Sequence, residues 1–327
     1  MSEAGDWDPG PWQGHDFTSA KKKYDVHVGR SYSDAVSSQV NPLDLVPASL
    51  STESRAPLVV ACDVTGSMGE SPAVIFSKCP YLDLEGKEYL GDDMEICFAA
   101  VGDAYSDNYP LQVRNFDKGL NLKNRLEELI IEGNGGGQQK ESYDLAALYF
   151  ASNVQMPNAI HPIFIFIGDE GLYDFVNNDQ AEKWTYVSLA KRMGYKQVLE
   201  KLKQKFAVYI IRQPYQQTGT DEMSPADKVI HRQWAEVLGE DHIAFLPDAA
   251  RVVDVIFGIL ARETGKIDYF RGEIIQRQTA DQVKTAFKGL ATIHGLPAPP
   301  ADPRSKDPGK SVVKKRGGKT GKSKPLL

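Results

Sequence analysis

The chain alternates short, unbroken apolar runs with longer segments in which apolar residues recur at helical spacing. The runs are rich in β-branched or aromatic residues and have no alternating polar face, which is typical of strands buried on both sides. They cover residues 58–62, 96–101, 163–167, 206–211 and 243–246. LQVRNF at 111–116 is predicted to form a short, hairpin-like edge strand.

Between these runs, Leu122, Leu126 and Leu129 repeat at helical spacing ahead of Gly133, which we expect to cap that helix. Further helices are predicted around Leu145, Leu148 and Tyr149 and over about 180–204, 226–239, 248–264 and 267–294. This alternation predicts an α/β fold: a doubly wound, mostly parallel sheet flanked by helices. In such folds, ligands bind beyond the carboxyl ends of the strands.

Composition fits one large domain with appendages. The chain has 327 residues, of which 41% are hydrophobic and 25% charged, enough to bury a sizeable core. We expect an N-terminal arm over 1–54, the α/β domain over 55–264, a helical extension over 265–296 and a basic tail over 297–327. The arm carries tryptophans and tyrosines in polar stretches, so it either packs along the core or anchors a partner.

The three cysteines form no CxxC pair and are expected to be buried thiols in a reducing compartment. No stretch has the roughly 18 apolar residues that a membrane span needs, and MSEAGDWDPG does not resemble a leader. The sequence therefore predicts a cytoplasmic protein that does not bind membranes.

The net charge of −6 is unevenly distributed. Residues 301–327 hold nine lysines and arginines and two aspartates, or +7, which leaves −13 on residues 1–300. The tail is poor in large apolar residues and is expected to be disordered. It could contact nucleic acid or an acidic protein, or simply aid solubility.

Three aspartates follow predicted strands. Asp63 comes directly after the first run, while Asp103 and Asp169 each follow a glycine after the next central runs. All three are expected at the carboxyl edge of the sheet, where carboxylate and hydroxyl oxygens suit Mg²⁺.

The stretch DVTGSMG after the first run resembles the DxSxS metal-ion-dependent adhesion site of von Willebrand factor A (VWA) domains, with Thr65 in place of the first serine. The family adds a hydroxyl from a second loop, for which GNGGGQQKESYDLAALYF offers Ser142, and an aspartate from a third loop, here Asp169 in IFIGDEG. The resemblance covers about residues 55–264. It implies a Mg²⁺ site, or one for Mn²⁺ or Ca²⁺, formed by Asp63, Thr65, Ser67, Ser142 and Asp169.

In that family the ion binds an acidic side chain of a partner protein, and no bond is made or broken. The resemblance therefore implies an interaction or scaffold module rather than an enzyme. Relatives of this fold often serve AAA+ ATPases, so such an ATPase is a candidate partner. GDAYSDNYPLQV and GGGQQKESYDLA also resemble uncharacterised bacterial and phage VWA proteins.

Other interpretations of the same residues remain open. Thr65 and Ser67 could cap a helix that begins near Gly69, and Ser142 fits an N-cap as well as a ligand. Asp103 and Asp107 are interpreted as turn residues.

Enzyme chemistry has weaker support. A haloacid dehalogenase phosphatase needs a carboxylate two residues after its nucleophile, where this chain has Thr65. Lys140 is followed by glutamate, unlike a P-loop, and the six histidines show no HExxH pairing. A Mg²⁺-dependent phosphoryl-transfer or nuclease enzyme using Asp63, Asp103 and Asp169 stays an alternative. A structural component of a bacterial or phage assembly, with contacts made by the arms, is another.

Overall fold

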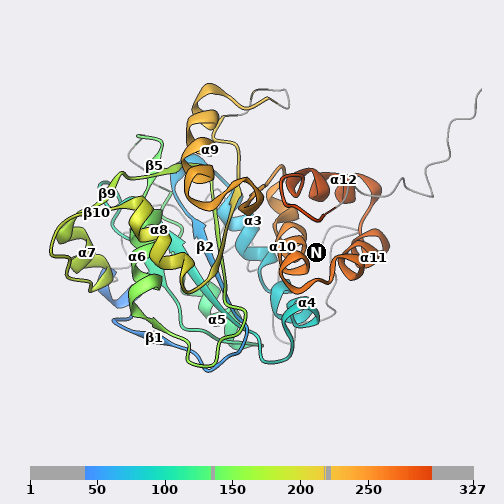
Figure 1. Cartoon of the computed structure of the whole chain (residues 1–327), viewed down its shortest axis with the longest axis horizontal. Helices are drawn as coiled ribbons and strands as arrows, with labels where there is room; N and C mark the ends of the chain where they lie inside the picture. The colour runs from blue at the N-terminus through green and yellow to red at the C-terminus, as the bar shows by residue number, and fades with distance from the viewer. Residues whose placement is uncertain (1–40, 134–136, 217, 219–221, 297–327) are drawn as a thin grey trace, which may run out of the picture.

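The computed structural model describes residues 41–133, 137–216, 218 and 222–296 (Figure 1). The basic tail and residues 1–40 of the predicted arm lie outside these ranges. Across the described part, no helix combines the length and apolar character needed to cross a membrane.

A six-stranded sheet forms the centre of the molecule, with the order β12-β11-β7-β2-β3-β4. Its members are β2 (Pro57–Asp63), β3 (Glu95–Val101), β4 (Leu111–Val113), β7 (Ile163–Gly168), β11 (Ala207–Arg212) and β12 (Ile243–Phe245). Five strands run parallel, and β4 pairs antiparallel with β3 at one edge. The predicted α/β fold class and the six predicted strands are confirmed.

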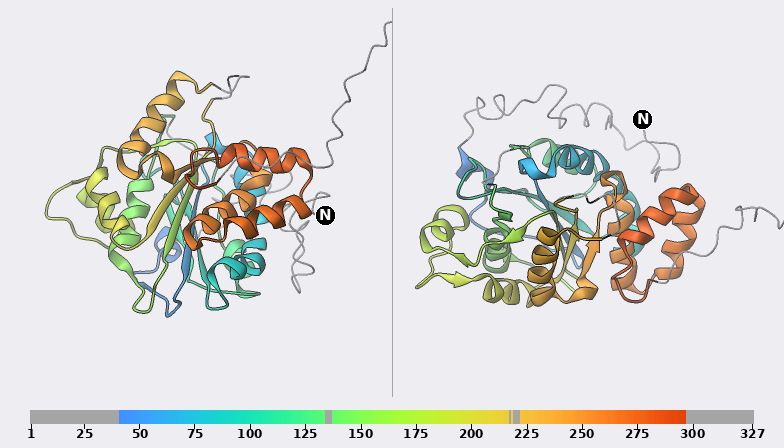
Figure 2. Two further views of the ribbon diagram at one scale, coloured as in Figure 1. Left: turned by 45° about the vertical axis from the view of Figure 1, so that its right-hand side comes forward. Right: turned by 90° about the horizontal axis from the view of Figure 1, so that it is seen from above.

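Helices cover both faces of the sheet, as the two views in Figure 2 show. Along β2, Leu58, Val60 and Cys62 point into one apolar core, while Val59 and Ala61 point into the other. The first core lies under α3 (Ser71–Lys78), α4 (Tyr81–Leu90), α5 (Asn121–Glu127), α10 (Val252–Thr264), α11 (Ile267–Arg277) and α12 (Ala280–Gly289). The second lies under α6 (Tyr143–Asn153), α7 (Asn178–Thr185), α8 (Tyr195–Lys203) and α9 (Pro225–Leu238). Because both faces are covered, the strands read as continuous apolar runs.

Three helix predictions need correction. The helix expected to end at Gly133 ends at Glu127, and Gly133 instead donates its backbone N–H to the Val64 carbonyl at 3.1 Å. The helix expected over about 180–204 is split into α7 and α8 by a left-handed Tyr186 (φ 56°) and a small hairpin of β9 (Phe175–Val176) with β10 (Met193–Gly194). Two helices, α3 and α4, lie over 71–90, where the sequence analysis considered only one helix that begins near Gly69.

The C-terminal helices pack on the core of the domain. They gather beside α4 at one end of the molecule (Figure 1). Thr279 and Gln282 form a reciprocal capping box that starts α12. A Cβ on Gly258 of α10 would lie 2.3 Å from a methyl carbon of Leu290, so only glycine allows the two segments to approach this closely.

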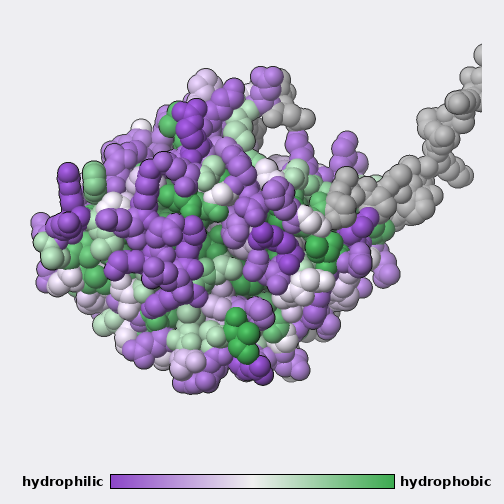
Figure 3. All heavy atoms as spheres, viewed as in Figure 1, coloured by the Kyte–Doolittle hydropathy of each residue, from purple (hydrophilic) through white to green (hydrophobic). Residues whose placement is uncertain are grey.

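The described part of the predicted arm lies against the domain. Its 3₁₀ turn η1 (Pro42–Leu45) is followed by β1 (Leu50–Ser51), which pairs with β6 (Val154–Gln155). The Tyr149 hydroxyl donates to the Pro47 carbonyl at 2.7 Å. Elsewhere, large exposed apolar side chains such as Ile160 and Val229 are scattered, and Figure 3 shows a face covered mainly by hydrophilic residues.

Candidate functional site

Asp63 is the last residue of β2, and its side chain is fully buried at the carboxyl edge of the sheet. Its Oδ1 accepts hydrogen bonds from the Thr65 backbone N–H at 2.9 Å and from the Thr65 hydroxyl at 2.6 Å. Thr65 precedes the 3₁₀ turn η2 (Gly66–Met68) but makes no capping hydrogen bond with its side chain. The threonine hydroxyl is therefore directed at the carboxylate.

Ser67 connects the β2 loop to the β7 loop. Its Oγ lies 3.2 Å from the Thr65 hydroxyl and donates to Asp169 Oδ1 at 3.1 Å. Asp169 directly follows β7, the neighbour of β2 in the sheet. The structure thus joins four of the five predicted site residues in one hydrogen-bonded chain.

Asp169 has an oxygen with no partner. The residue is fully buried, yet its Oδ2 forms no hydrogen bond. A buried acceptor left unsatisfied costs about 1–3 kcal/mol, and more when it is charged. A bound cation would satisfy this oxygen.

Ser142 lies on the second loop of the resemblance, at the start of α6, and its side chain forms a different hydrogen bond. It occupies the N-cap position of α6 but makes no capping hydrogen bond, and its Oγ accepts from the Ala104 N–H at 2.9 Å. The structure therefore does not join Ser142 to the other four predicted residues through a hydrogen bond.

Tyr143 was missed by the sequence analysis. Its hydroxyl donates to Asp63 Oδ2 at 2.5 Å, which occupies the second oxygen of that carboxylate. Gly168 makes room for this contact, since a Cβ there would lie 1.8 Å from the Tyr143 hydroxyl oxygen. The glycine before Asp169 was visible in the sequence, but its partner was not.

Glu141 and Glu170 were also missed. Glu141 is the second residue of the short strand β5 (Lys140–Glu141), and Glu170 directly precedes the short strand β8 (Gly171–Leu172). The two strands pair in parallel. Burial raises the pKa of Glu141, and this pairing brings the glutamates close enough for the charge of Glu170 to raise that pKa further. Both glutamates are buried, and Glu141 Oε2 has no partner.

The electrostatics of this group are unbalanced. Within the described residues, no lysine or arginine pairs with Asp63, Glu141, Asp169 or Glu170. Burial, then the charges of Asp63 and Glu170, raise the pKa of Asp169 to about 8. Burial and Asp63 raise the pKa of Glu170 to about 7. Burial also raises the pKa of Asp63. Without a cation, the folded chain favours protonation of these acids.

Asp103 and Asp107 act as turn residues in the structure. Asp103 accepts hydrogen bonds from the Tyr105 N–H at 3.0 Å, the Ser106 hydroxyl at 2.9 Å and the Tyr173 hydroxyl at 3.0 Å. Asp107 accepts from the Asp103 N–H at 2.7 Å. These bonds occupy both oxygens of Asp103.

The donor set limits how a metal ion could bind. Across the described ranges, no three His, Cys, Asp or Glu side chains are arranged to hold one ion together. A cation beside Asp63 and Asp169 would therefore take two carboxylates and complete its shell with hydroxyls and water. Such an all-oxygen set fits Mg²⁺ or Ca²⁺.

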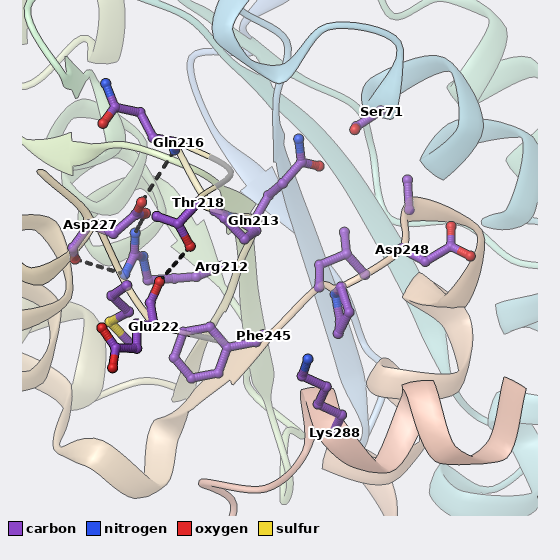
Figure 4. A pocket seen from close by; sticks show the side chains of 15 residues that line it. Ser71, Arg212, Gln213, Gln216, Thr218, Glu222, Asp227, Phe245, Asp248 and Lys288 are labelled. Carbon is purple, nitrogen blue, oxygen red and sulfur yellow. Dashed lines mark hydrogen bonds and ion pairs between the residues drawn. The ribbon is translucent and has the colours of Figure 1, made fainter. Parts of the chain in front are cut away.

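A cavity of about 630 Å³ opens beyond β11 and β12 (Figure 4). Its wall includes the buried ion pair of Arg212 and Asp227, and Lys288 reaches it from α12. The Gln213 N–H donates to the Gly168 carbonyl at 2.9 Å, which links this wall to the strand that precedes Asp169. The volume lies within the range of small-molecule sites.

Comparisons with known proteins yielded distant structural matches. No family model and no curated protein matches the chain. Among solved structures, it is similar to the pilus adhesin SpaC from Lactobacillus rhamnosus GG in its open conformation, with a TM-score of 0.44 and 9% identity over 70% of this chain and 31% of the adhesin. A second structure of that adhesin gives a TM-score of 0.44 and 10% identity over 71% and 32%. The chain spans about a third of the adhesin's length, and this likeness carries no argument about function.

Proposed function

We propose that this chain is a VWA-type binding module that captures a carboxylate of a protein partner through a bound divalent cation. Asp63, Thr65, Ser67 and Asp169 would hold the ion, Mg²⁺ by preference and Mn²⁺ or Ca²⁺ as alternatives, with Ser142 contributing from the second loop. The observation that carries the proposal is the buried, unpartnered Oδ2 of Asp169 at the end of a hydrogen-bonded chain of hydroxyls and carboxylates.

The chain's own residues prepare this site. Tyr143 holds Asp63 Oδ2, and Thr65 holds Oδ1, so the carboxylate is fixed before any ligand arrives. The hydroxyls of Thr65 and Ser67 supply neutral oxygens, which leave a cation more attractive to an outside carboxylate than a ring of acids would. When bound, the ion supplies the electrophilic contact for that partner.

The wider setting of the proposal rests on the resemblance of DVTGSMG to the family motif. It includes a scaffold role without catalysis and an AAA+ ATPase as the candidate partner. A cytoplasmic location is proposed separately, from the cysteine pattern and the lack of a long apolar run in the sequence. The alternatives of an assembly component and of a Mg²⁺-dependent enzyme predict different results in the experiment below.

The test compares the full chain with Asp63→Ala and with Asp92→Ala. Asp92 is exposed in the turn between α4 and β3 and serves as the matched control. Mg²⁺ is expected to stabilise the wild type and Asp92→Ala against urea, by about 2.7 kcal/mol at a hundred times its Kd. Asp63→Ala is expected to lose this stabilisation.

The same three proteins are then used to capture partners from the native cell, with Mg²⁺ or with EDTA. A partner captured only with Mg²⁺, and not by Asp63→Ala, supports the proposal. A partner set indifferent to EDTA would overturn it. A hydrolytic activity lost in Asp63→Ala would favour the enzyme alternative.

A further inference from the structure

Two buried glutamates beside the proposed site have no role in it so far. Glu141 is 1% exposed and Glu170 is 4% exposed, and both lie next to the loop that carries Ser67. Their proximity comes from backbone pairing, because β5 aligns Lys140 with Gly171 and Glu141 with Leu172. The pairing of β5 with β8 thus places the carboxyl groups of Glu141 and Glu170 near each other and away from bulk water.

One carboxylate oxygen of this pair accepts no hydrogen bond. Glu141 Oε2 is buried without a hydrogen-bond partner. The charged groups that act on Glu141 are acidic: Asp63, Glu170, Asp103 and Asp107. The adjacent Lys140 does not compensate Glu141, since its ammonium lies 3.1 Å from Asp174.

Charge balance argues for more than one cation. Asp63, Asp169, Glu141 and Glu170 can together carry four negative charges, and one divalent ion neutralises two. Two of the four acids have a buried oxygen that lacks a hydrogen-bond partner, Asp169 Oδ2 and Glu141 Oε2. Each of these oxygens is free to contact a cation.

We propose that Glu141 and Glu170 form a second subsite for a divalent cation, with the Ser67 hydroxyl lying between the two subsites. The inference rests on the proposed function for the first ion, held beside Asp63 and Asp169. All donors are oxygens, so the subsite takes a hard cation such as Mg²⁺, Mn²⁺ or Ca²⁺. The near-complete burial of both glutamates favours a small ion over the long side chain of a partner's lysine.

Mn²⁺ is the probe for the test, because its bound amount can be counted and its electron paramagnetic resonance spectrum responds to a second nearby Mn²⁺. The full chain is dialysed against Mn²⁺ and analysed for metal. We expect two ions in the wild type with a spin-coupled spectrum. Glu141→Gln and, independently, Glu170→Gln are each expected to retain one ion with an uncoupled spectrum.

Two further variants separate this inference from the proposed function. Asp63→Asn is expected to keep one ion, and Glu236→Gln, at an exposed glutamate on α9, is expected to keep both. A wild type with one ion that Asp63→Asn loses and Glu141→Gln retains overturns the second subsite and leaves the proposed function intact. A wild type with one ion that Glu141→Gln loses and Asp63→Asn retains overturns the proposed function and supports cation binding by the glutamates. No bound ion overturns both.

Binding of a basic side chain is a distinct outcome. If the wild type binds only one Mn²⁺ and a lysine-rich peptide binds to it, with Glu141→Gln abolishing peptide binding, the second cation is a partner's ammonium group and the divalent subsite is overturned. The urea midpoint of each variant in EDTA is the folding control. Glutamine keeps the shape of glutamate and removes an uncompensated buried charge, so the variants are expected to fold.

Discussion

Two groups of buried charges lie at the same edge of the sheet and are built in opposite ways. At the end of β11, the Arg212 guanidinium lies 3.0 Å from Asp227 Oδ1, and both side chains are almost fully buried. At the ends of β2 and β7, the acids around Asp63 and Asp169 have no basic partner within the described residues.

The pKa shifts of the two groups differ accordingly. Burial acts to raise the pKa of Asp227, but hydrogen bonds from Ser224 and from the Tyr215 and Gln216 N–H groups, together with Arg212, outweigh it and lower that pKa. Burial raises the pKa of Asp169 to about 8. Removing one partner of a buried ion pair is costly because it leaves a buried charge uncompensated, whereas buried acids with strongly raised pKa values are typical of functional sites.

The largest expected effect comes from breaking the balanced group. Arg212→Met leaves Asp227 buried without its counter-charge, which is expected to cost about 3–5 kcal/mol of the free energy of unfolding, measured in urea. Lys196→Met removes the cation of an exposed pair with Glu236 and is expected to leave the midpoint unchanged. Equal losses in the two variants would show that the burial of the Arg212–Asp227 pair adds nothing to its contribution to stability.

The second prediction uses pH in the presence of EDTA. The folded chain raises the pKa of Asp169 from 3.8 to about 8 and that of Glu170 from 4.5 to about 7. It therefore binds more protons than the unfolded chain between pH 5 and 8, so stability is expected to fall as pH rises through this window. The slope is up to about 1.4 kcal/mol per pH unit for each proton.

Urea midpoints at pH 5, 6, 7 and 8 measure this slope. Asp169→Asn is expected to flatten it, and saturating Mg²⁺ is expected to oppose it by favouring the charged acids. The contribution of Asp227 to the pH dependence of stability has the opposite sign. Its lowered pKa stabilises the folded chain, and this stabilisation is lost only as the solution becomes more acidic. A stability that stays constant or rises from pH 5 to 8 in EDTA would refute an uncompensated acid group.

The smallest expected effect is the difference in stability loss between phenylalanine substitutions at two tyrosines of α6. Tyr143→Phe leaves the buried Asp63 Oδ2 without its donor and is expected to cost about 1–3 kcal/mol in EDTA. Tyr149→Phe, the matched change, removes a hydrogen bond to the Pro47 carbonyl and is expected to cost about 0.5–1.5 kcal/mol. Thermal unfolding of both variants measures the difference. A larger loss of stability in Tyr149→Phe than in Tyr143→Phe would mean that the hydrogen bond to Asp63 contributes no more to stability than an ordinary one.

The fold was predictable where one physical signal dominated. Continuous apolar runs identified the central strands, because burial on both faces leaves no polar position in them. The break at Tyr186 was not predictable, since a left-handed tyrosine has no glycine or proline to mark it. The end of α5 at Glu127 was missed because Leu129 continues the apolar spacing and is buried outside the helix.

The candidate site divides in the same way. Asp63 and Asp169 were found because each follows a strand, so the sheet brings them to one edge. Glu141 and Glu170 meet through strands of two residues, which are too short to produce any periodic pattern in the sequence. The contact between Tyr143 and Asp63 depends on the three-dimensional path of the second loop, which leads into α6, and local patterning does not encode that path.

The close approach of Tyr143 to Gly168 also restricts how the sequence can evolve. A Cβ at position 168 would lie 1.8 Å from the tyrosine oxygen, so any larger residue there collides unless position 143 has already become smaller. A larger residue at position 168 is therefore tolerated only after the residue at position 143 has been replaced by a smaller one. In descendants of this sequence, the residue at 143 is expected to change first, and a lineage that keeps the tyrosine is expected to keep the glycine.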